Sequence, residues 1–214
     1  APMAQWVLMA AHPTLVPRRG GALDPDYPGR VAAALETKGG VATVLQTAGG
    51  NASAALALDA FSDAVVQEVA KVPTSSPLAT LDIGYAAFEV QLPHPDGTRL
   101  VPAVLLPATE NLLCARASMV AEVGAVRLGP LVLLSVPAEV TLAAAQRLVG
   151  ATGAQVVSLA NGYTGYVESD ALVRLGEGEA KRQYFPPEVV KLLAEGARLA
   201  LDGAGPATMT AVPQ

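Results

Sequence analysis

Short apolar runs of strand length recur along this chain, and segments of helical periodicity lie between most of them. The runs cover 5–13, 41–46, 121–129, 131–139 and 155–160. Runs this short match buried strands and fall far below the roughly 20 residues that a membrane-spanning helix needs. Strands that alternate with helices in this way predict an α/β fold, with a mixed layered sheet and flanking helices.

Four helices are predicted from periodicity and from their stop signals. A short Ala-rich helix is expected from Arg30 to Lys38, before a glycine pair, and a longer one over 54–71. A third is expected over 141–149. The last is marked by apolar residues that recur every four positions, and these are Val189, Leu193, Ala197 and Leu201.

The Asp96-Gly97 pair is a hairpin signal, because this dipeptide suits the tight turn between two antiparallel strands. It lies between the segments 80–92 and 98–106, which both contain apolar strand-forming residues. These two segments are therefore predicted to pair as a β-hairpin.

The composition indicates one substantial core and excludes several function classes. The chain has 214 residues, of which 51% are hydrophobic and 15% charged, so we expect one layered domain over 1–204 and a flexible tail over 205–214. The net charge is −5 and no basic run is present, which argues against a nucleic-acid or anionic-membrane partner. Cys114 is the only cysteine, so an intrachain disulfide and a thiolate zinc site are both excluded.

Polar residues able to do chemistry follow the ends of the apolar runs. His12 follows the first run, Ser53 the second, Glu139 the run at 131–139, and the pair Tyr163 and Tyr166 the run at 155–160. Strand ends that meet at one edge of a sheet are where α/β proteins gather their sites. We therefore expect these side chains to form one site.

Each of these residues also has a purely structural explanation. His12 could be a hydrogen-bonded histidine at a strand end, and Glu139 an acidic residue in the first turn of a helix. Ser53 could be the N-cap of the 54–71 helix, and the two tyrosines could cap the core from a turn. His94, within the predicted hairpin, is expected to be exposed.

Six short sequence motifs, taken in order along the chain, resemble motifs of the neutral/alkaline non-lysosomal ceramidases. They are "MAAHPT" (9–14), "DPDYPG" (24–29), "LQTAGGNAS" (45–53), "LLSVPAEVT" (133–141), "VVSLANGYTGYV" (156–167) and "KRQYF" (181–185). The resemblance runs from about residue 1 to 190, and the tyrosine turn is its most specific part. It implies that 1–204 is the C-terminal portion of a ceramidase-like catalytic domain.

The resemblance also implies a zinc-dependent amidase that hydrolyses the N-acyl bond of ceramide or of another N-acyl amide. Members of this family hold their zinc ion with two His, one Glu and one Tyr. When the motifs are aligned one by one, His12 matches the second of those histidines, Glu139 the glutamate and Tyr166 the tyrosine. Imidazole and carboxylate are common zinc ligands, and the cation itself lowers the pKa of a bound phenol.

Two further residues receive catalytic roles from the same alignment. Ser53 matches the family's serine, a proposed nucleophile or water-positioning group. Tyr184 matches a tyrosine thought to stabilise the developing oxyanion. Tyr163 is then a supporting residue of its turn. Asn51 and Ala54 stand where the family has Asp and Pro, so the hydrogen bonding around Ser53 is expected to differ.

The first metal-binding His of the family belongs to a region that precedes residue 1 of this chain. We expect an N-terminal partner chain, produced by cleavage of a precursor, to supply that His. A fragment of a longer protein and a degenerate relative that has lost catalysis are the alternatives. Secretion or a periplasmic location is expected from the resemblance alone.

Two other functions are compatible with parts of the sequence. The glycines of "GGVATVLQTAGGNAS" lie where a phosphate-binding loop would, yet they fit neither of the common nucleotide-binding spacings. A serine hydrolase with a nucleophile elbow would need a G-x-S-x-G motif, which the sequence lacks. A small-ligand-binding module therefore stays open as the alternative to the amidase.

Overall fold

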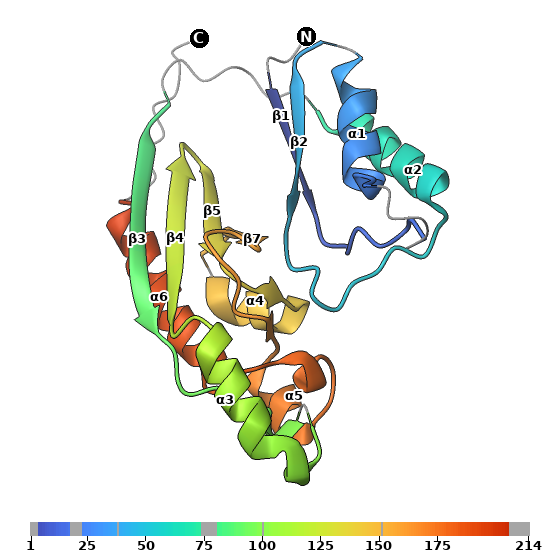
Figure 1. Cartoon of the computed structure of the whole chain (residues 1–214). Coiled ribbons are helices and arrows are strands. Elements are labelled where there is room, and N and C mark those ends of the chain that lie inside the picture. Colours follow the sequence, from blue (N-terminus) through green and yellow to red (C-terminus); the bar gives the residue numbers. More distant parts are fainter. Residues whose placement is uncertain are drawn as a thin grey trace.

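The computed structural model describes residues 4–17, 23–37, 39–73, 81–99, 101–150 and 152–205. These residues form two packing units, which Figure 1 shows beside each other. The N-terminal unit covers 4–73 and the C-terminal unit covers 81–205. The predicted tail at 205–214 lies, apart from Gly205, outside the described residues.

The N-terminal unit is a two-stranded parallel sheet with two helices on one face (Figure 1). Its elements are β1 (Ala4–Met9), α1 (Asp26–Glu36), β2 (Val41–Gln46) and α2 (Leu58–Lys71). β1 and β2 pair in register from Ala4 opposite Val41 to Met9 opposite Gln46. Both strands end at the same edge, which places the residues after Met9 beside those after Gln46.

The small core of this unit lies between its sheet and its helices. Tyr27 and Val31 of α1 are fully buried there, and the ring of Tyr27 meets Phe61 of α2 edge to face at 5.0 Å. Aromatic pairs favour this geometry because the positive ring edge meets the negative ring face.

The C-terminal unit contains a four-stranded sheet in the order β3-β4-β5-β7. The strands are β3 (Ile83–Gln91), β4 (Val120–Leu128), β5 (Leu131–Val136) and β7 (Gln155–Ser158). β4 is antiparallel to both β3 and β5, whereas β5 and β7 are parallel and connected through α4 (Leu142–Val149). The remaining helices are α3 (Leu106–Arg116), α5 (Asp170–Leu175) and α6 (Val189–Gly203), with short 3₁₀ turns at Gly97–Arg99, Ala103–Leu105 and Ala180–Arg182.

Helix α6 covers one face of β3 and β4 and forms the larger core with them (Figure 1). The residues that predicted its apolar face are all buried, and they are Val189, Leu193, Ala197 and Leu201. Gly196 allows close packing at the crossing, because a Cβ there would come within 2.4 Å of a Val90 methyl group.

The C-terminal unit also contains a second sheet of two very short parallel strands, which lie just before α4 and just before α5. They are β6 (Glu139–Val140) and β8 (Tyr166–Val167), with Glu139 opposite Tyr166. The loop after β2 reaches this point, since the Gly50 N–H donates to the Val140 carbonyl at 2.9 Å. The two packing units therefore meet at β6.

The predicted hairpin around Asp96-Gly97 is wrong. β3 pairs instead with β4, and the intervening segment 97–116 forms 3₁₀ turns and α3. The Asp96 carboxylate accepts a hydrogen bond from the Thr98 N–H at 2.9 Å, which turns the chain into a helical bend instead of a hairpin. His94 is exposed as expected, although in a loop.

Two helix boundaries also differ from prediction. The helix expected from Arg30 begins at Asp26, with Pro28 in its first turn, where the missing N–H of proline does no harm. The helix expected over 54–71 begins at Leu58, with Ala57 as its N-cap. Ser53 is therefore not the N-cap of this helix. Across the described ranges, no helix combines the length and the apolar character that a bilayer crossing requires.

Candidate functional site

His12 lies in the loop after β1, close to the loop that follows β2. Its N–H donates to the Ala52 carbonyl at 3.0 Å, and His12 and Ser53 form an isolated parallel bridge. The parallel pairing of β1 with β2 thus continues, after a gap, into the two loops. This places His12 alongside Ser53, as predicted from the strand ends.

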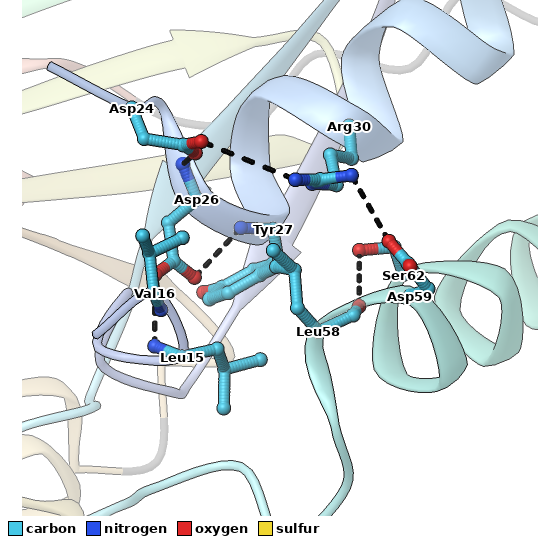
Figure 2. Close-up of polar contacts among 9 residues, drawn as sticks. All are labelled: Leu15, Val16, Asp24, Asp26, Tyr27, Arg30, Leu58, Asp59 and Ser62. Atoms are coloured by element: carbon cyan, nitrogen blue, oxygen red, sulfur yellow. Dashed lines mark hydrogen bonds and ion pairs between the residues drawn. The ribbon is translucent and has the colours of Figure 1, made fainter. Parts of the chain in front are cut away.

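The start of α1 holds the loop that carries His12. The Asp26 carboxylate accepts hydrogen bonds from the N–H groups of Leu15 and Val16, each at 2.8 Å, as Figure 2 shows. The Tyr27 hydroxyl donates to the carbonyl of Ala11 at 2.7 Å. These bonds fix the chain on both sides of His12, and we call Asp26 and Tyr27 the α1 clamp.

The α1 clamp contains local strain. Asp26 has φ of +53°, a left-handed conformation that a residue with a side chain adopts only at a cost. The Asp26 side chain is buried. Burial of Tyr27, together with the nearby Asp26 charge, raises the pKa of Tyr27 to about 12. The backbone contacts that Asp26 makes offset the strain and the burial of its carboxylate.

Glu139 and Tyr166 lie opposite each other in the β6–β8 ladder. The Glu139 N–H donates to the Gly165 carbonyl at 2.9 Å, and the Thr141 N–H to the Val167 carbonyl at 3.1 Å. Glu139 is a strand residue that precedes the α4 N-cap, Thr141, by two positions. The explanation of Glu139 as a first-turn helix residue is therefore wrong.

The tyrosine turn after β7 is held against the connection between β5 and β6. Thr164 donates to the Pro137 carbonyl through its N–H at 2.6 Å and its hydroxyl at 2.9 Å. Leu159 and Asn161 have φ near +60°, which is unusual for Leu. The strained turn returns the chain so that Tyr166 can pair with Glu139.

His12, Glu139 and Tyr166 converge from the two packing units. His12 Nε2 lies 3.5 Å from Glu139 Oε2 and 3.5 Å from the Tyr166 hydroxyl. It also lies 3.3 Å from the Gly50 carbonyl oxygen. The His12 and Glu139 side chains are only 19% and 16% exposed. The structure thus brings together the three residues that the resemblance assigns to the metal.

A second set of contacts orients these three side chains. The Tyr163 hydroxyl donates to Glu139 Oε1 at 2.7 Å, which leaves Oε2 facing His12. Arg182 lies over the Tyr166 ring, with its Cζ atom 5.4 Å from the ring centroid, and its Nη1 lies 3.4 Å from the Tyr166 hydroxyl.

Both tyrosine hydroxyls hold their protons more tightly than usual. Burial raises the pKa of Tyr166, its contact with Glu139 raises it further, and Arg182 opposes this shift. Burial and the hydrogen bond to Glu139 likewise raise the pKa of Tyr163. Tyr163 is therefore a neutral donor to the Glu139 carboxylate.

The two predicted catalytic residues lie on different sides of this cluster. Ser53 is exposed, in the N-terminal unit beside His12. The Tyr184 ring lies against Gly165, where a Cβ would be 2.7 Å from its Cδ2 atom, and Tyr184 contributes to the raised pKa of Tyr163. Ser53 thus lies beside the metal-site candidate of the N-terminal unit, and Tyr184 lies beside the tyrosine turn of the C-terminal unit.

The separations of Glu139 and Tyr166 from His12 fit the requirements of a zinc ion. Ligand atoms about 2.0–2.2 Å from a tetrahedral zinc ion lie about 3.3–3.6 Å from one another, which matches the two separations of 3.5 Å. In the described part of the chain, no three His, Cys, Asp or Glu side chains form a metal-binding group. A metal at this point therefore depends on Tyr166 as the third donor.

Sequence reasoning did not single out Arg182 or Glu168. Arg182 is part of the "KRQYF" motif, but nothing in its spacing indicates a contact with Tyr166. Glu168 is fully buried, whereas a glutamate after two strand residues ordinarily predicts exposure. Only the three-dimensional structure identifies both.

Comparisons with known proteins identify solved structures with a similar fold. No protein-family model and no curated protein matches this chain. The structure is similar to the crystal structure of neutral ceramidase from Pseudomonas aeruginosa, with a TM-score of 0.66 and 19% identity over 94% of this chain. It is also similar to a ceramidase complexed with C2, with a TM-score of 0.66 and 17% identity over 99% of this chain.

The chain spans 44% and 47% of the lengths of these two proteins, so it corresponds to less than half of each. At such identities the likeness concerns the fold. It confirms the resemblance noted in the sequence at this level: the chain has a mixed α/β fold of the kind found in neutral ceramidase structures.

Proposed function

We propose that this chain contributes the metal-binding side of a zinc-dependent amide hydrolase that cleaves an N-acyl bond, in ceramide or in another N-acyl amide. The observation that carries the proposal is the convergence of three donors, with His12 Nε2 at the spacing of tetrahedral ligands from both Glu139 Oε2 and the Tyr166 hydroxyl. The fold shared with two ceramidase structures supports the same reading. The similar proteins are ceramidases by name, and the choice of ceramide as substrate rests on them.

In the proposed enzyme, His12, Glu139 and Tyr166 hold the zinc ion, which supplies Lewis-acid activation of the amide carbonyl and of water. Tyr163 holds Glu139 in its orientation by donating to Oε1. The net reaction adds water across the C–N bond, so the acyl group leaves as a carboxylic acid and the nitrogen as an amine.

Ser53 and Tyr184 take the roles that lie around the reacting carbonyl. Ser53 lies beside His12 and is exposed, so a substrate can reach its hydroxyl, which acts as the nucleophile or positions the attacking water. The Tyr184 hydroxyl donates to the oxygen that gains negative charge as the carbonyl is attacked. Arg182 lies over the Tyr166 ring and lines the Tyr166 side of the site.

A partner chain or a further segment of polypeptide completes the proposed site with another His. The sheet of the N-terminal unit supports this step, because β1 pairs only with β2 among the described strands and its other edge borders a groove. The groove has a volume of about 1350 Å³ and is lined by β1 and by apolar residues of α2. A strand at the edge of a sheet presents backbone N–H and C=O groups for pairing, so a further strand fits beside β1. Secretion or a periplasmic location belongs to the same proposal.

Zinc binding tests the proposed function directly. We expect the purified protein to bind about one zinc ion per chain, and the variants His12→Ala, Glu139→Ala and Tyr166→Phe to lose at least tenfold in affinity. His94→Ala is the matched control, because His94 is the only other histidine and lies in an exposed loop. Isothermal titration with zinc measures the affinities, and an intact-mass spectrum identifies any partner chain.

Two results would contradict the proposal. If wild-type protein bound no zinc, the three residues would be part of a scaffold without catalysis. Zinc binding that His94→Ala weakened as much as His12→Ala would place the metal elsewhere. The proposed hydrolysis is tested separately from zinc binding. We expect the zinc-loaded protein to release a fatty acid from an N-acyl amide, and Ser53→Ala to lose this activity.

A further inference from the structure

Glu168 is a fully buried carboxyl group that the proposed reaction does not use. Within the described ranges, no Lys, Arg or His forms an ion pair with it, and all its partners are hydrogen-bond donors. Its carboxyl oxygens accept from the Thr141 hydroxyl at 2.9 Å, the Ser169 N–H at 2.6 Å and the Glu179 N–H at 3.3 Å. A buried acceptor with this many partners restrains each segment that supplies a donor.

The donors to Glu168 come from the segments that carry the candidate site. Thr141 follows Glu139 by two residues, and Glu168 follows Tyr166 by two residues. The bond between Thr141 and Glu168 therefore adds a third link to the β6–β8 ladder, directly beyond its two paired positions.

A two-residue ladder needs such a link because its own register is weakly determined. In a strand, a shift by one residue turns every side chain to the opposite face. A shift of β8 against β6 would turn Tyr166 away from Glu139 and from His12. The bond to Thr141 opposes this shift, because Glu168 reaches the Thr141 hydroxyl only in the observed register.

Both the carboxylate and the backbone of Glu168 contact the loop that carries Arg182 and Tyr184. The carboxylate accepts from the Glu179 N–H, and the backbone N–H of Glu168 donates to Gln183 Oε1 at 2.8 Å. The Gln183 amide donates in turn to the carbonyl of Phe185 at 2.8 Å. Gln183 is fully buried between the two residues that approach the tyrosines. Gly178 lets this loop pass close by, since a Cβ there would come within 2.5 Å of Glu168 Oε2.

We propose that Glu168 is a positioning residue that sets the register of β6 against β8 and so places Glu139 and Tyr166 on the face that meets His12. The functional part of this inference rests on the proposed function, because the register affects metal binding only if these residues bind a metal. The effect of Glu168 on the register itself does not depend on zinc. The Glu168 carboxylate does not touch the donor cluster itself and acts through its bonds to Thr141 and to the Glu179 N–H.

The test uses Glu168→Gln and Glu168→Ala, with Glu177→Gln as the matched control. Glu177 is an exposed glutamate of the same loop. The Gln side chain keeps the size of Glu and one acceptor oxygen, but its amide nitrogen cannot accept from the Glu179 N–H. Glu168→Gln is therefore expected to retain part of the positioning, and it keeps the test decisive if Glu168→Ala is too unstable to measure.

The first measurement is amide hydrogen exchange by NMR on the metal-free protein. Glu168→Ala is expected to speed exchange at least fivefold at the Glu139 and Thr141 amides, which donate to the Gly165 and Val167 carbonyls, and Glu168→Gln is expected to speed it less. The His12 amide, which donates to Ala52 in the N-terminal unit, is expected to change by less than twofold. A residue with a general structural role would instead speed exchange throughout the chain.

The second measurement is zinc affinity by isothermal titration. We expect a loss of about tenfold in Glu168→Ala, a smaller loss in Glu168→Gln, and wild-type affinity in Glu177→Gln. Unchanged exchange at Glu139 and Thr141 in both Glu168 variants would overturn the positioning role whatever the zinc result. If exchange became faster at Glu139 and Thr141 in the Glu168 variants but the wild-type protein bound no zinc, the register role would be upheld and only the proposed function would be overturned.

Discussion

The two packing units present their site residues by different means. In the C-terminal unit, Glu139 and Tyr166 follow strands that belong to a large core covered by α6. In the N-terminal unit the core is small and the sheet has two strands, so that Trp6 is 49% exposed and Val41 61% exposed. His12 therefore depends much more on local polar contacts than Glu139 does.

Each unit uses one buried carboxyl group for this purpose. Asp26 accepts three backbone N–H bonds, from Leu15, Val16 and Tyr27, and Glu168 accepts bonds from the segments around Glu139 and Tyr166. Asp26 holds a loop without regular structure, whereas Glu168 extends a ladder that already exists. The difference indicates that loss of Asp26 will cost stability, while loss of Glu168 will mainly change register.

The largest expected effect is that of Asp26→Ala. The change leaves the partly buried N–H groups of Leu15 and Val16 without their acceptor and removes the buried bond to the Tyr27 N–H. Unpaired buried donors cost about 1–3 kcal/mol each, so we expect a loss of about 3 kcal/mol in the free energy of unfolding. Urea unfolding followed by circular dichroism measures it.

Asp59→Ala is the matched control for Asp26→Ala. Asp59 forms an ion pair with Arg30 at 3.0 Å, as Figure 2 shows, but its side chain is 83% exposed. Exposed ion pairs contribute about 0–1 kcal/mol, so Asp59→Ala should hardly change stability. Equal losses in the two variants would show that the α1 clamp does not depend on burial of Asp26.

The second effect concerns the contact between the two units. Gly50 approaches β6 so closely that a Cβ would lie 2.8 Å from the Glu139 carbonyl oxygen and 2.8 Å from the Val140 carbonyl carbon. Both atoms belong to the backbone and cannot rotate away, so Gly50→Ala must separate the loop from β6. We expect a loss of about 2 kcal/mol in the free energy of unfolding.

Zinc titration of Gly50→Ala then tests whether the site lies between the units. Separation of the loop from β6 moves His12 away from Glu139, and we expect zinc affinity to fall about tenfold. Unchanged zinc affinity in a destabilised Gly50→Ala protein would show that the metal does not bridge the units.

A third, smaller effect is expected for Tyr27→Phe, which keeps the ring but removes the hydrogen bond to Ala11. This change should cost about 1 kcal/mol of stability at neutral pH. Burial raises the pKa of Tyr27 to about 12, so the folded chain keeps a proton that the unfolded chain loses near pH 10. Wild-type stability should therefore fall between pH 10 and 12, by up to about 1.4 kcal/mol per pH unit.

Tyr27→Phe lacks this contribution, so the unfolding free energies of the two proteins should approach and cross between pH 10 and 12. Tyr163, whose pKa is also raised, remains in both proteins and cancels from the difference. Urea unfolding at intervals of half a pH unit measures the two curves. Parallel curves over this range would show that Tyr27 ionises with its ordinary pKa in the folded chain.

Local sequence signals predicted the elements that local physics determines. The four-residue spacing along α6 predicted its buried face, and the apolar run at Val41–Gln46 predicted β2 with its observed bounds. The hairpin at Asp96-Gly97 failed because the partner of β3 lies beyond α3, and a turn signal carries no information on distant pairing. The sequence could not distinguish a bend that starts a helical segment from a hairpin turn.

The candidate site was predicted through the family resemblance and the order of the strand ends. His12, Glu139 and Tyr166 lie together, and Ser53 and Tyr184 lie near them. The positioning groups were missed. Burial of a carboxylate such as Asp26 or Glu168 depends on donors that only the folded chain brings to it, and no periodicity predicts this.

The smallest expected effect is that of Asn51→Ala, at the same junction as Gly50. Asn51 Oδ1 accepts from the Leu142 N–H at 3.2 Å, at the first residue of α4. Thr141 already caps this helix by accepting from the Ala144 N–H, so Asn51 satisfies only one further donor. We expect a loss of about 0.5 kcal/mol in the free energy of unfolding, measured by urea unfolding. Asn51→Asp keeps the acceptor and adds a negative charge near the helix N-terminus, where the dipole favours it, and should stabilise the junction slightly. If Asn51→Ala and Asn51→Asp both left stability unchanged, the bond from the Leu142 N–H to Asn51 would contribute nothing to the junction between the two units.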